Sequence, residues 1–227
     1  MGESIKVVLL GESGVGKTSI LTRFAMGQFK TDSMPTTGAT FTSKSLQIPN
    51  EGINVTFHIW DTAGQEKYHS LAHMYYKDAS VAVLVYDIHS KITFERMKVW
   101  VDELRDKAPH NVFIFIAGNK SDVTEGEEVT LDEAMKFATS VNAPITLTSA
   151  KDATGIKELF MDIARKVAKK VSKPKGDPNN KSEHSQGKSS KQSDDLAIDP
   201  STSTGKKGTK LTSKTDNKTG KKGGCCK

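Results

Sequence analysis

The feature that most constrains the fold of this chain is the octapeptide at residues 11–18, Gly-Glu-Ser-Gly-Val-Gly-Lys-Thr. It has the spacing G-x-x-x-x-G-K-[ST], in which backbone N–H groups of a glycine-rich turn surround a phosphate group. The apolar residues 5–10 before it are typical of a buried strand, and residues 19–25 after it begin a helical pattern. We therefore predict a strand, a phosphate-binding loop and a helix whose N-terminus adds partial positive charge. In this arrangement Lys17 reaches the phosphates, and the Thr18 hydroxyl binds a Mg²⁺ ion.

Apolar runs and helical patterns alternate along the rest of residues 1–171. The runs typical of strands are 5–10, 41–48, 53–60, 81–86, 112–117 and 144–148, and the further helical patterns are 67–77, 92–107, 131–141 and 156–171. The second and third runs alternate in polarity around Pro-Asn-Glu-Gly, which predicts a hairpin. We therefore expect an α/β fold of the P-loop NTPase type. Its six-stranded sheet is mostly parallel with one antiparallel strand, and helices cover both faces.

Two helices carry more specific expectations. In the helix at 92–107, four apolar residues are expected on one side: Phe94, Val99, Val101 and Leu104. In the next helix, Thr130 and Glu133 have the spacing of a capping box.

Composition divides the chain into a folded domain, residues 1–171, and a tail, residues 172–227. The tail has few apolar residues, so it cannot offset the entropy cost of ordering, and we expect it to be disordered. Its last 23 residues hold eight lysines against Asp216, whereas the domain has 20 basic and 21 acidic residues. The domain therefore has no charge that favours nucleic acid, and the end of the tail suits an anionic surface. The two cysteines, Cys225 and Cys226, are adjacent and outside the core, which fits a reducing compartment.

A second motif, Asp61-Thr62-Ala63-Gly64-Gln65, follows the strand that ends at residue 60. In an α/β sheet, ligands bind beyond the carboxyl ends of the strands. An aspartate at this place can hold Mg²⁺, directly or through a water. The Gly64 N–H can contact a γ-phosphate, and Gln65 can orient an attacking water.

A third motif, Asn119-Lys120-Ser121-Asp122, follows the strand at 112–117. The Asp122 carboxylate can accept hydrogen bonds from the N1–H and the 2-amino group of guanine. Adenine lacks both donors, and a site built around hydrogen bonds discriminates strongly against a base that leaves it unpaired. Asn119 can read the other base edge or brace the phosphate loop, and the Lys120 stem can lie along the ring. After the last strand, the Ala150 N–H of Ser149-Ala150-Lys151 can meet the guanine carbonyl, with Lys151 beside the base.

The motifs GESGVGKT, WDTAGQE, GNKSD and TSAK occur in the order found in Ras-superfamily small GTPases, and residues 5–171 resemble that superfamily. The segment WDTAGQEKYHSL and the ending Cys-Cys-Lys resemble the Rab family. Residues 35–41 and 71–76 are most similar to its early-endosomal branch. One departure is Thr37, which stands where the family usually has isoleucine.

The resemblance implies roles for further residues. Thr36 falls on the threonine that completes the Mg²⁺ shell and contacts the γ-phosphate, and Phe29 falls on the ring that packs against guanine. The metal ligands implied are Thr18, Thr36 and Asp61. The implied catalytic residues are Lys17, Gly64 and Gln65. The remaining nucleotide-binding positions are Ser13, Gly14, Val15, Gly16, Ser19, Asn119, Lys120, Asp122, Ser149, Ala150 and Lys151. The aromatic triad that Rabs present to effectors falls on Phe41, Trp60 and Tyr75, and the prenylated cysteines on Cys225 and Cys226.

The function implied is a Mg²⁺-dependent switch that binds GTP, hydrolyses it slowly to GDP and phosphate, and regulates vesicle trafficking. Its expected partners are a GTPase-activating protein, a guanine nucleotide exchange factor, effectors, and the prenylation escort and GDP-dissociation inhibitor proteins. We expect a monomer on the cytoplasmic face of a membrane, with early-endosomal transport as the first interpretation and a secretory or late endocytic membrane as the alternative. Two other classes compete with it: an ATP-dependent enzyme, which Asp122 disfavours, and a module that binds GTP without hydrolysing it.

Overall fold

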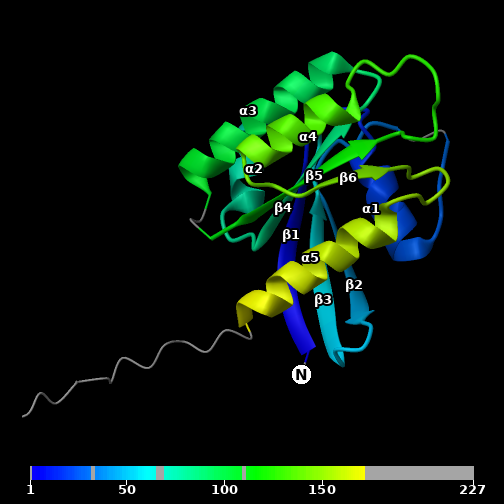
Figure 1. Ribbon diagram of the computed structural model, residues 1–227. Helices are drawn as coiled ribbons and strands as arrows, with labels where there is room; N and C mark the ends of the chain where they lie inside the picture. Colours follow the sequence, from blue (N-terminus) through cyan, green and yellow to red (C-terminus); the bar gives the residue numbers. More distant parts are fainter. Residues whose placement is uncertain (1, 32–33, 65–68, 109–110, 172–227) are drawn as a thin grey trace, which may run out of the picture. The chain divides into compact units, whose positions relative to one another are not determined.

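In the described part of the chain, six strands form one sheet in the order β2-β3-β1-β4-β5-β6. The computed structural model describes residues 2–31, 34–64, 69–108 and 111–171. In chain order the elements are β1 (Gly2–Leu10), α1 (Lys17–Met26), β2 (Thr40–Ile48), β3 (Ile53–Asp61), α2 (His69–Tyr76), β4 (Val81–Asp87), α3 (Lys91–Lys107), β5 (Phe113–Asn119), α4 (Leu131–Ser140), β6 (Ile145–Thr148) and α5 (Ile156–Val171) (Figure 1).

The pairing of the strands follows the polarity of their sequences. β2 and β3 alternate in polarity and form the antiparallel hairpin, with Phe41 opposite Trp60. β1, β3, β4, β5 and β6 pair in parallel. β4 lies inside the sheet, and its six residues from Val81 to Tyr86 are all buried. The predicted six-stranded sheet with one antiparallel strand is confirmed.

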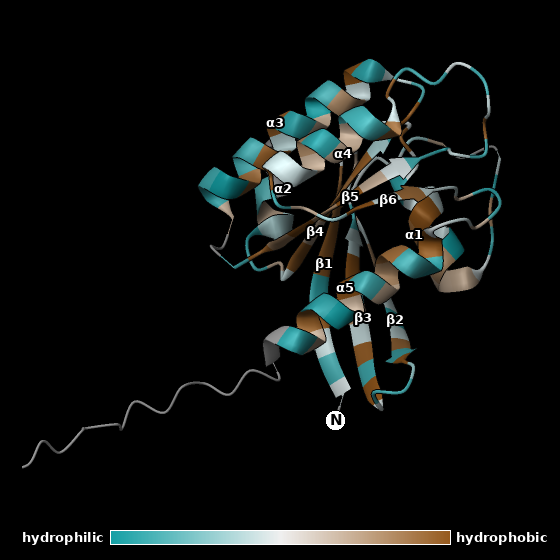
Figure 2. Ribbon diagram, viewed as in Figure 1, coloured by the Kyte–Doolittle hydropathy of each residue, from teal (hydrophilic) through white to brown (hydrophobic). Residues whose placement is uncertain are grey.

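Each face of the sheet is covered by its own helices. Along β1, Val7 and Leu9 pack under α1 and α5, while Val8 and Leu10 pack under α3 and α4. Successive side chains of a strand point to opposite faces, so the apolar run at the end of β1 contributes side chains to two cores. Figure 2 shows the result, with mostly hydrophobic residues along the strands at the centre of the sheet and many hydrophilic residues along the helices that cover it.

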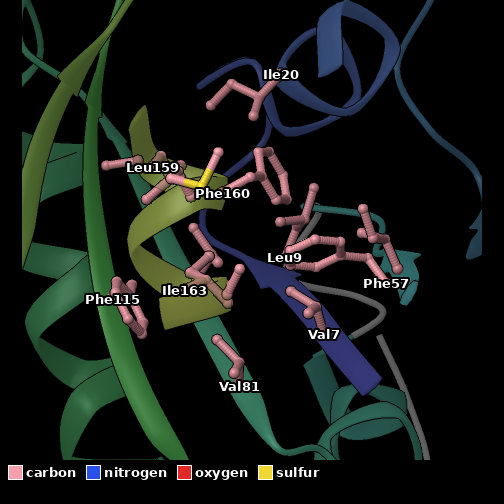
Figure 3. Close-up of a cluster of buried hydrophobic side chains, with 14 of the residues drawn as sticks. Val7, Leu9, Ile20, Phe57, Val81, Phe115, Leu159, Phe160 and Ile163 are labelled. Atoms are coloured by element: carbon pink, nitrogen blue, oxygen red, sulfur yellow. The ribbon is translucent and has the colours of Figure 1, made fainter. Parts of the chain in front are cut away.

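The larger of the two cores lies between the sheet and the pair α1 and α5. The apolar side of α5 is buried in it and consists of Ile156, Leu159, Phe160, Ile163 and Val167; Figure 3 shows Phe160 and Ile163 turned toward Val7 and Leu9 of β1. Each such side chain contributes about 1.5–3 kcal/mol on burial. Because α1 packs on the same core, the helix that follows the phosphate loop is fixed against the sheet.

Two local expectations from the sequence are wrong in part. On α3, Phe94, Val101 and Leu104 are buried, but Val99 is 59% exposed. Val99 lies about 140° around the helix from Phe94, since each residue turns by about 100°. The Thr130 hydroxyl does accept the Glu133 N–H at 3.3 Å.

The reciprocal half of the capping box is replaced by another contact. The Glu133 carboxylate pairs with the Lys91 ammonium at the start of α3 instead of returning to the backbone of its own helix. This bond joins α3 to α4 across the surface.

The order of the strands determines where a site can form. β1 lies between β3 and β4. The strands β3 and β2 therefore extend the sheet on one side of β1, and β4, β5 and β6 extend it on the other. In open parallel sheets, ligands bind at such a switch point, beyond the carboxyl ends of the strands. Four loops meet there, and they follow β1, β3, β5 and β6. The phosphate loop and the segments 61–64, 119–122 and 149–151 lie in these loops or at their edges.

Candidate functional site

The phosphate loop, residues 11–16, turns between β1 and α1. Gly16 has φ +96, and a Cβ on it would collide with the side-chain amide of Asn119. A Cβ on Gly64, in the loop after β3, would meet the backbone of Glu12 and the ammonium of Lys17. The glycines therefore allow two separate loops to close around the same space.

Lys17 begins α1, and its side chain folds back over the loop. Its Nζ donates to the carbonyl oxygens of Gly11 at 2.7 Å and Glu12 at 2.8 Å, and the residue is only 5% exposed. Burial lowers the pKa of this ammonium to about 8, although the nearby carboxylates of Asp61 and Glu12 oppose the shift. An anion placed beside the ammonium would favour its charged form, so the position suits a phosphate group.

Three oxygen-bearing side chains meet beside Lys17. The Thr18 hydroxyl donates to Asp61 Oδ2 at 2.5 Å and lies 2.9 Å from the hydroxyl of Thr36. The second carboxylate oxygen of Asp61, Oδ1, is buried and has no hydrogen-bond partner among the described residues. Burial raises the pKa of the Asp61 carboxyl, while the bond from Thr18 and the charge of Lys17 oppose that shift. Hydroxyl and carboxylate oxygens around an unsatisfied buried oxygen form a donor set that suits Mg²⁺.

Asn119 ends β5 and ties three segments together. Its Nδ2 donates to the carbonyl of Val15 in the phosphate loop at 2.8 Å, and its Oδ1 accepts from the Thr148 hydroxyl at 3.2 Å. The residue is 2% exposed. The sequence leaves two roles open for Asn119, contact with the base and bracing of the phosphate loop. The bond to Val15 is the contact that the second role requires.

The Asp122 carboxylate is oriented by the loop after β6. The Ser149 hydroxyl donates to Asp122 Oδ1 at 2.7 Å, and Lys151 Nζ lies 3.6 Å from Asp122 Oδ2. The backbone N–H groups of Lys151 and Asp152 donate to the Ser149 oxygen at 3.2 Å. A buried serine thus fixes both the carboxylate and the turn beside it.

Lys120 adopts an unusual backbone conformation, with φ 71. Its Nζ pairs with Asp87 Oδ2 at 2.6 Å, at the end of β4. The other oxygen of that carboxylate accepts the His89 N–H at 3.0 Å. The ion pair fixes the end of the Lys120 side chain, and a flat ring could lie along the stem of this residue.

These loops enclose one cleft of about 330 Å³. The sequence-predicted residues that line it are Ser13, Gly14, Gly16, Lys17, Thr18, Ser19, Phe29, Thr36, Gly64, Asn119, Lys120, Asp122, Ala150 and Lys151. Val15, Asp61 and Ser149 are buried behind its walls and act on it through the contacts above. A phosphate loop, a candidate cation site and a carboxylate for a base thus share a single space.

Comparison with known proteins assigns the family. The sequence model of the Ras family matches residues 6–169. Ras-related protein Rab-31 of Homo sapiens is 47% identical over 163 residues, which make up 72% of this chain and 83% of that protein. Ras-related protein Rab-22A of Homo sapiens is 46% identical over the same shares of both chains. Ras-related protein RABF2b of Arabidopsis thaliana is 44% identical over 71% of this chain and 80% of its own.

The chain belongs to the Ras family, as a Rab-type small GTPase. It binds GTP, hydrolyses it to GDP and phosphate, and acts as a switch in vesicle trafficking. The resemblance derived from the motifs is confirmed, and so is the α/β small-GTPase fold.

The aromatic residues that the Rab resemblance singles out lie together outside the cleft. Trp60 on β3 contacts Phe41 on β2 and Tyr75 on α2, with ring centroids 5.4 Å and 5.7 Å apart. Phe41 is 53% exposed, and the other two are half-buried. The rings therefore form a partly exposed cluster at the surface of this Rab-type GTPase.

Some predicted residues lie outside the described part of the chain. They are Gln65, expected to orient the attacking water, the lipidation sites Cys225 and Cys226, and the whole of the tail, residues 172–227.

Other cleft residues were not found from the sequence. Lys30, Thr31, Met34, Pro35 and Val123 also line the cleft. Four of them come from the polar stretch around Thr36, which has no periodicity that could have indicated its path. For these four residues, the only indication in the sequence was that they stand close to Phe29 or Thr36.

Proposed function

We propose that the cleft is the guanine-nucleotide site of a Mg²⁺-dependent Rab switch that acts in early-endosomal transport. The observation that carries the proposal is the shared cleft itself. Lys17, the pair Thr18 and Asp61, and Asp122 come from three separate motifs, and their contacts converge on one space.

The candidate cation site has three ligands in this proposal. Thr18, Thr36 and Asp61 would hold Mg²⁺, with Asp61 binding directly or through a water, and the buried free oxygen of Asp61 supports this. The ion would neutralise developing charge on the β- and γ-phosphates.

The base would be recognised at the other end of the cleft. The Asp122 carboxylate accepts from the N1–H and 2-amino groups of guanine, and the Ala150 N–H donates to its carbonyl oxygen. The ring lies between Phe29 and the Lys120 stem. The Ser149 bond to Asp122 supports this assignment, because it holds the carboxylate in one orientation.

Hydrolysis would depend on positioning and charge stabilisation. The loop N–H groups and Lys17 bind the phosphates, the Gly64 N–H contacts the γ-phosphate, and Gln65 orients the attacking water. The four motifs contain no arginine. GTPases without such an arginine turn over at about 10⁻⁴ s⁻¹, and an activator that supplies one accelerates them by about 10⁵, or about 7 kcal/mol of barrier. We therefore infer a slow enzyme that needs an activating protein, and an exchange factor to release GDP.

The switch itself would be the ordering of two segments. With the γ-phosphate bound, the contacts of Thr36 and Gly64 hold residues 30–42 and 64–77 in one conformation, and hydrolysis releases them. Effectors would dock on Phe41 in the first segment, Tyr75 in the second and Trp60 between their rings, because aromatic residues are enriched at interface cores. Thr37, also in the first segment, would influence which partners dock.

Attachment to the membrane would depend on the tail. None of the helices in the described part of the chain is long and apolar enough to cross a bilayer. Prenyl groups on both Cys225 and Cys226 would give stable anchoring, and the lysines of residues 205–227 would add attraction to anionic lipid. If the 56 residues of the tail behaved as a flexible coil, their root-mean-square span would be roughly 40 Å. Escort and GDP-dissociation inhibitor proteins would carry the lipidated monomer through the cytosol.

Localisation tests the membrane assignment. An N-terminally tagged Gln65→Leu form is expected to mark early endosomes, because it retains GTP and keeps its anchor. The same form with Cys225→Ser and Cys226→Ser is expected in the cytosol, because both lipid sites are gone. Imaging against endosomal and secretory markers measures both.

Two outcomes would contradict parts of this proposal. Secretory labelling would exclude the early-endosomal assignment, which is supported by the similarity of residues 35–41 and 71–76 to that branch, and would favour the alternative membrane. Unchanged membrane labelling of the serine form would exclude the lipid anchor.

A further inference from the structure

Arg23, two turns into α1, makes three short hydrogen bonds to backbone carbonyls. Its Nε donates to Ala150 at 2.7 Å, its Nη2 to Lys151 at 2.6 Å, and its Nη1 to Gly27 at 2.7 Å. The first two acceptors lie 127 and 128 residues away along the chain. One side chain therefore joins the helix of the phosphate loop to the loop after β6.

The geometry of the guanidinium suits this contact. It is planar and rigid, and its fork can donate to two acceptors at once. The two carbonyls that Arg23 binds on the loop are consecutive, so the 150–151 and 151–152 peptide groups are each held by one hydrogen bond. Lysine has a single ammonium on a flexible stem and cannot reproduce this arrangement.

The same loop is fixed from the opposite direction. The Ser149 hydroxyl donates to Asp122, and the Ser149 N–H donates to the carbonyl of Thr154 at 2.9 Å. Residue 149 is thus tied to the Asp122 side, and residues 150 and 151 to α1. Ala150, between the two ties, is 3% exposed and lines the cleft.

We propose that Arg23 is a positioning residue for base recognition: by holding the carbonyls of Ala150 and Lys151, it aims the Ala150 N–H at the 6-carbonyl of guanine. This inference rests on the proposed function, which assigns the base to this end of the cleft. The third bond, to Gly27, ties the base loop to the start of the segment that carries Phe29 and Thr36. Arg23 therefore fixes the loop that contacts the base relative to the helix that follows the phosphate loop.

The test compares three diphosphates that differ in the base. GDP has the 6-carbonyl, IDP keeps it but lacks the 2-amino group, and 6-thio-GDP carries sulfur, a weak acceptor, in its place. Dissociation rates are measured on the full-length protein loaded with each nucleotide, for the wild type, Arg23→Gln and Arg23→Lys. We expect Arg23→Gln to speed release of GDP and IDP about tenfold, which corresponds to the loss of one hydrogen bond to the base. Release of 6-thio-GDP should change less than about twofold, because that bond contributes little for this ligand.

The conservative variant and a matched control sharpen the result. Arg23→Lys keeps the charge and one donor direction, so we expect partial rescue with the same dependence on the base. Lys44 also donates to a backbone carbonyl near the end of α1, that of Ala25 at 3.0 Å, and this bond does not involve residues 149–151. Lys44→Gln should leave the ranking of the three nucleotides as in the wild type.

Two results would overturn the inference in different ways. Equal acceleration of all three nucleotides by Arg23→Gln would mean that Arg23 supports the domain in general, and the proposed nucleotide site would stand. Equal release of GDP and 6-thio-GDP from the wild-type protein would mean that Ala150 does not read the 6-carbonyl, and the assignment of the base would fail together with the role of Arg23.

Discussion

Asp122→Asn is expected to weaken GDP binding by about a thousandfold. The carboxylate accepts two hydrogen bonds from guanine in the proposed complex, and bonds to a charged group contribute about 1.5–3 kcal/mol each. The carboxamide of asparagine directs an N–H donor against the donors of the base. The Ser149 hydroxyl and the Lys151 ammonium keep the side chain at residue 122 in place. The loss of affinity should therefore come from the changed hydrogen-bonding groups and not from a shift of the side chain. Competition of unlabelled GDP against a fluorescent nucleotide measures it.

The same substitution should improve binding of xanthosine diphosphate. Xanthine has a carbonyl where guanine has its 2-amino group, and the asparagine N–H can donate to it. Asp152→Asn is the matched control, because Asp152 lies in the neighbouring turn and accepts the Thr154 N–H at 2.9 Å. Loss of affinity for both diphosphates in Asp122→Asn, with no gain for xanthosine diphosphate, would show that Asp122 does not face the base.

Gln65→Leu is expected to lower the activator-stimulated hydrolysis rate by about a thousandfold or more. Gln65 directly follows Gly64, which lines the cleft beside Lys17. Orientation of the attacking water is a large part of the roughly 10⁵-fold acceleration that activators produce in such enzymes. Leucine fills a similar volume but has no polar group for the water. Single-turnover phosphate release, with saturating activator, measures the effect.

Gln47→Leu makes the same chemical change at an exposed position on β2 and should hydrolyse GTP at the wild-type rate. Nucleotide dissociation should also be unchanged in Gln65→Leu, because the residue orients a water and does not bind GDP. A wild-type rate of stimulated hydrolysis in Gln65→Leu would remove Gln65 from the reaction.

Much of the fold could be predicted because its signals are local. The apolar run of β4, the alternating polarity of β2 and β3, and the turn between them each specify an element from a few neighbouring residues. The parallel sheet follows from the alternation of strands and helices. The exposure of Val99 shows the limit of such prediction. Its residue type is apolar, and nothing in the neighbouring sequence indicates that it lies outside the buried side of α3.

The candidate site was predictable to the extent that it consists of motifs. The phosphate loop and the segment from Asn119 to Asp122 each have a spacing that the chemistry requires. The residues that orient them have none, because their partners are far away in sequence. Arg23 binds carbonyls that any residue could supply, and Asp87 pairs with a lysine 33 positions later. Such contacts depend on the completed fold, so the sequence pattern does not indicate them.

The most direct test of the nucleotide site is single-turnover phosphate release from GTP and from ATP by the purified full-length protein, with Mg²⁺ and after chelation. With GTP and Mg²⁺ we expect slow release at about 10⁻⁴ s⁻¹. Chelation should abolish it, because Thr18, Thr36 and Asp61 then have no ion to hold. ATP should give no release above background, because Asp122 finds no donors on adenine. Comparable release from ATP, or release from GTP that survives chelation, would contradict a Mg²⁺-dependent guanine-nucleotide site in this cleft.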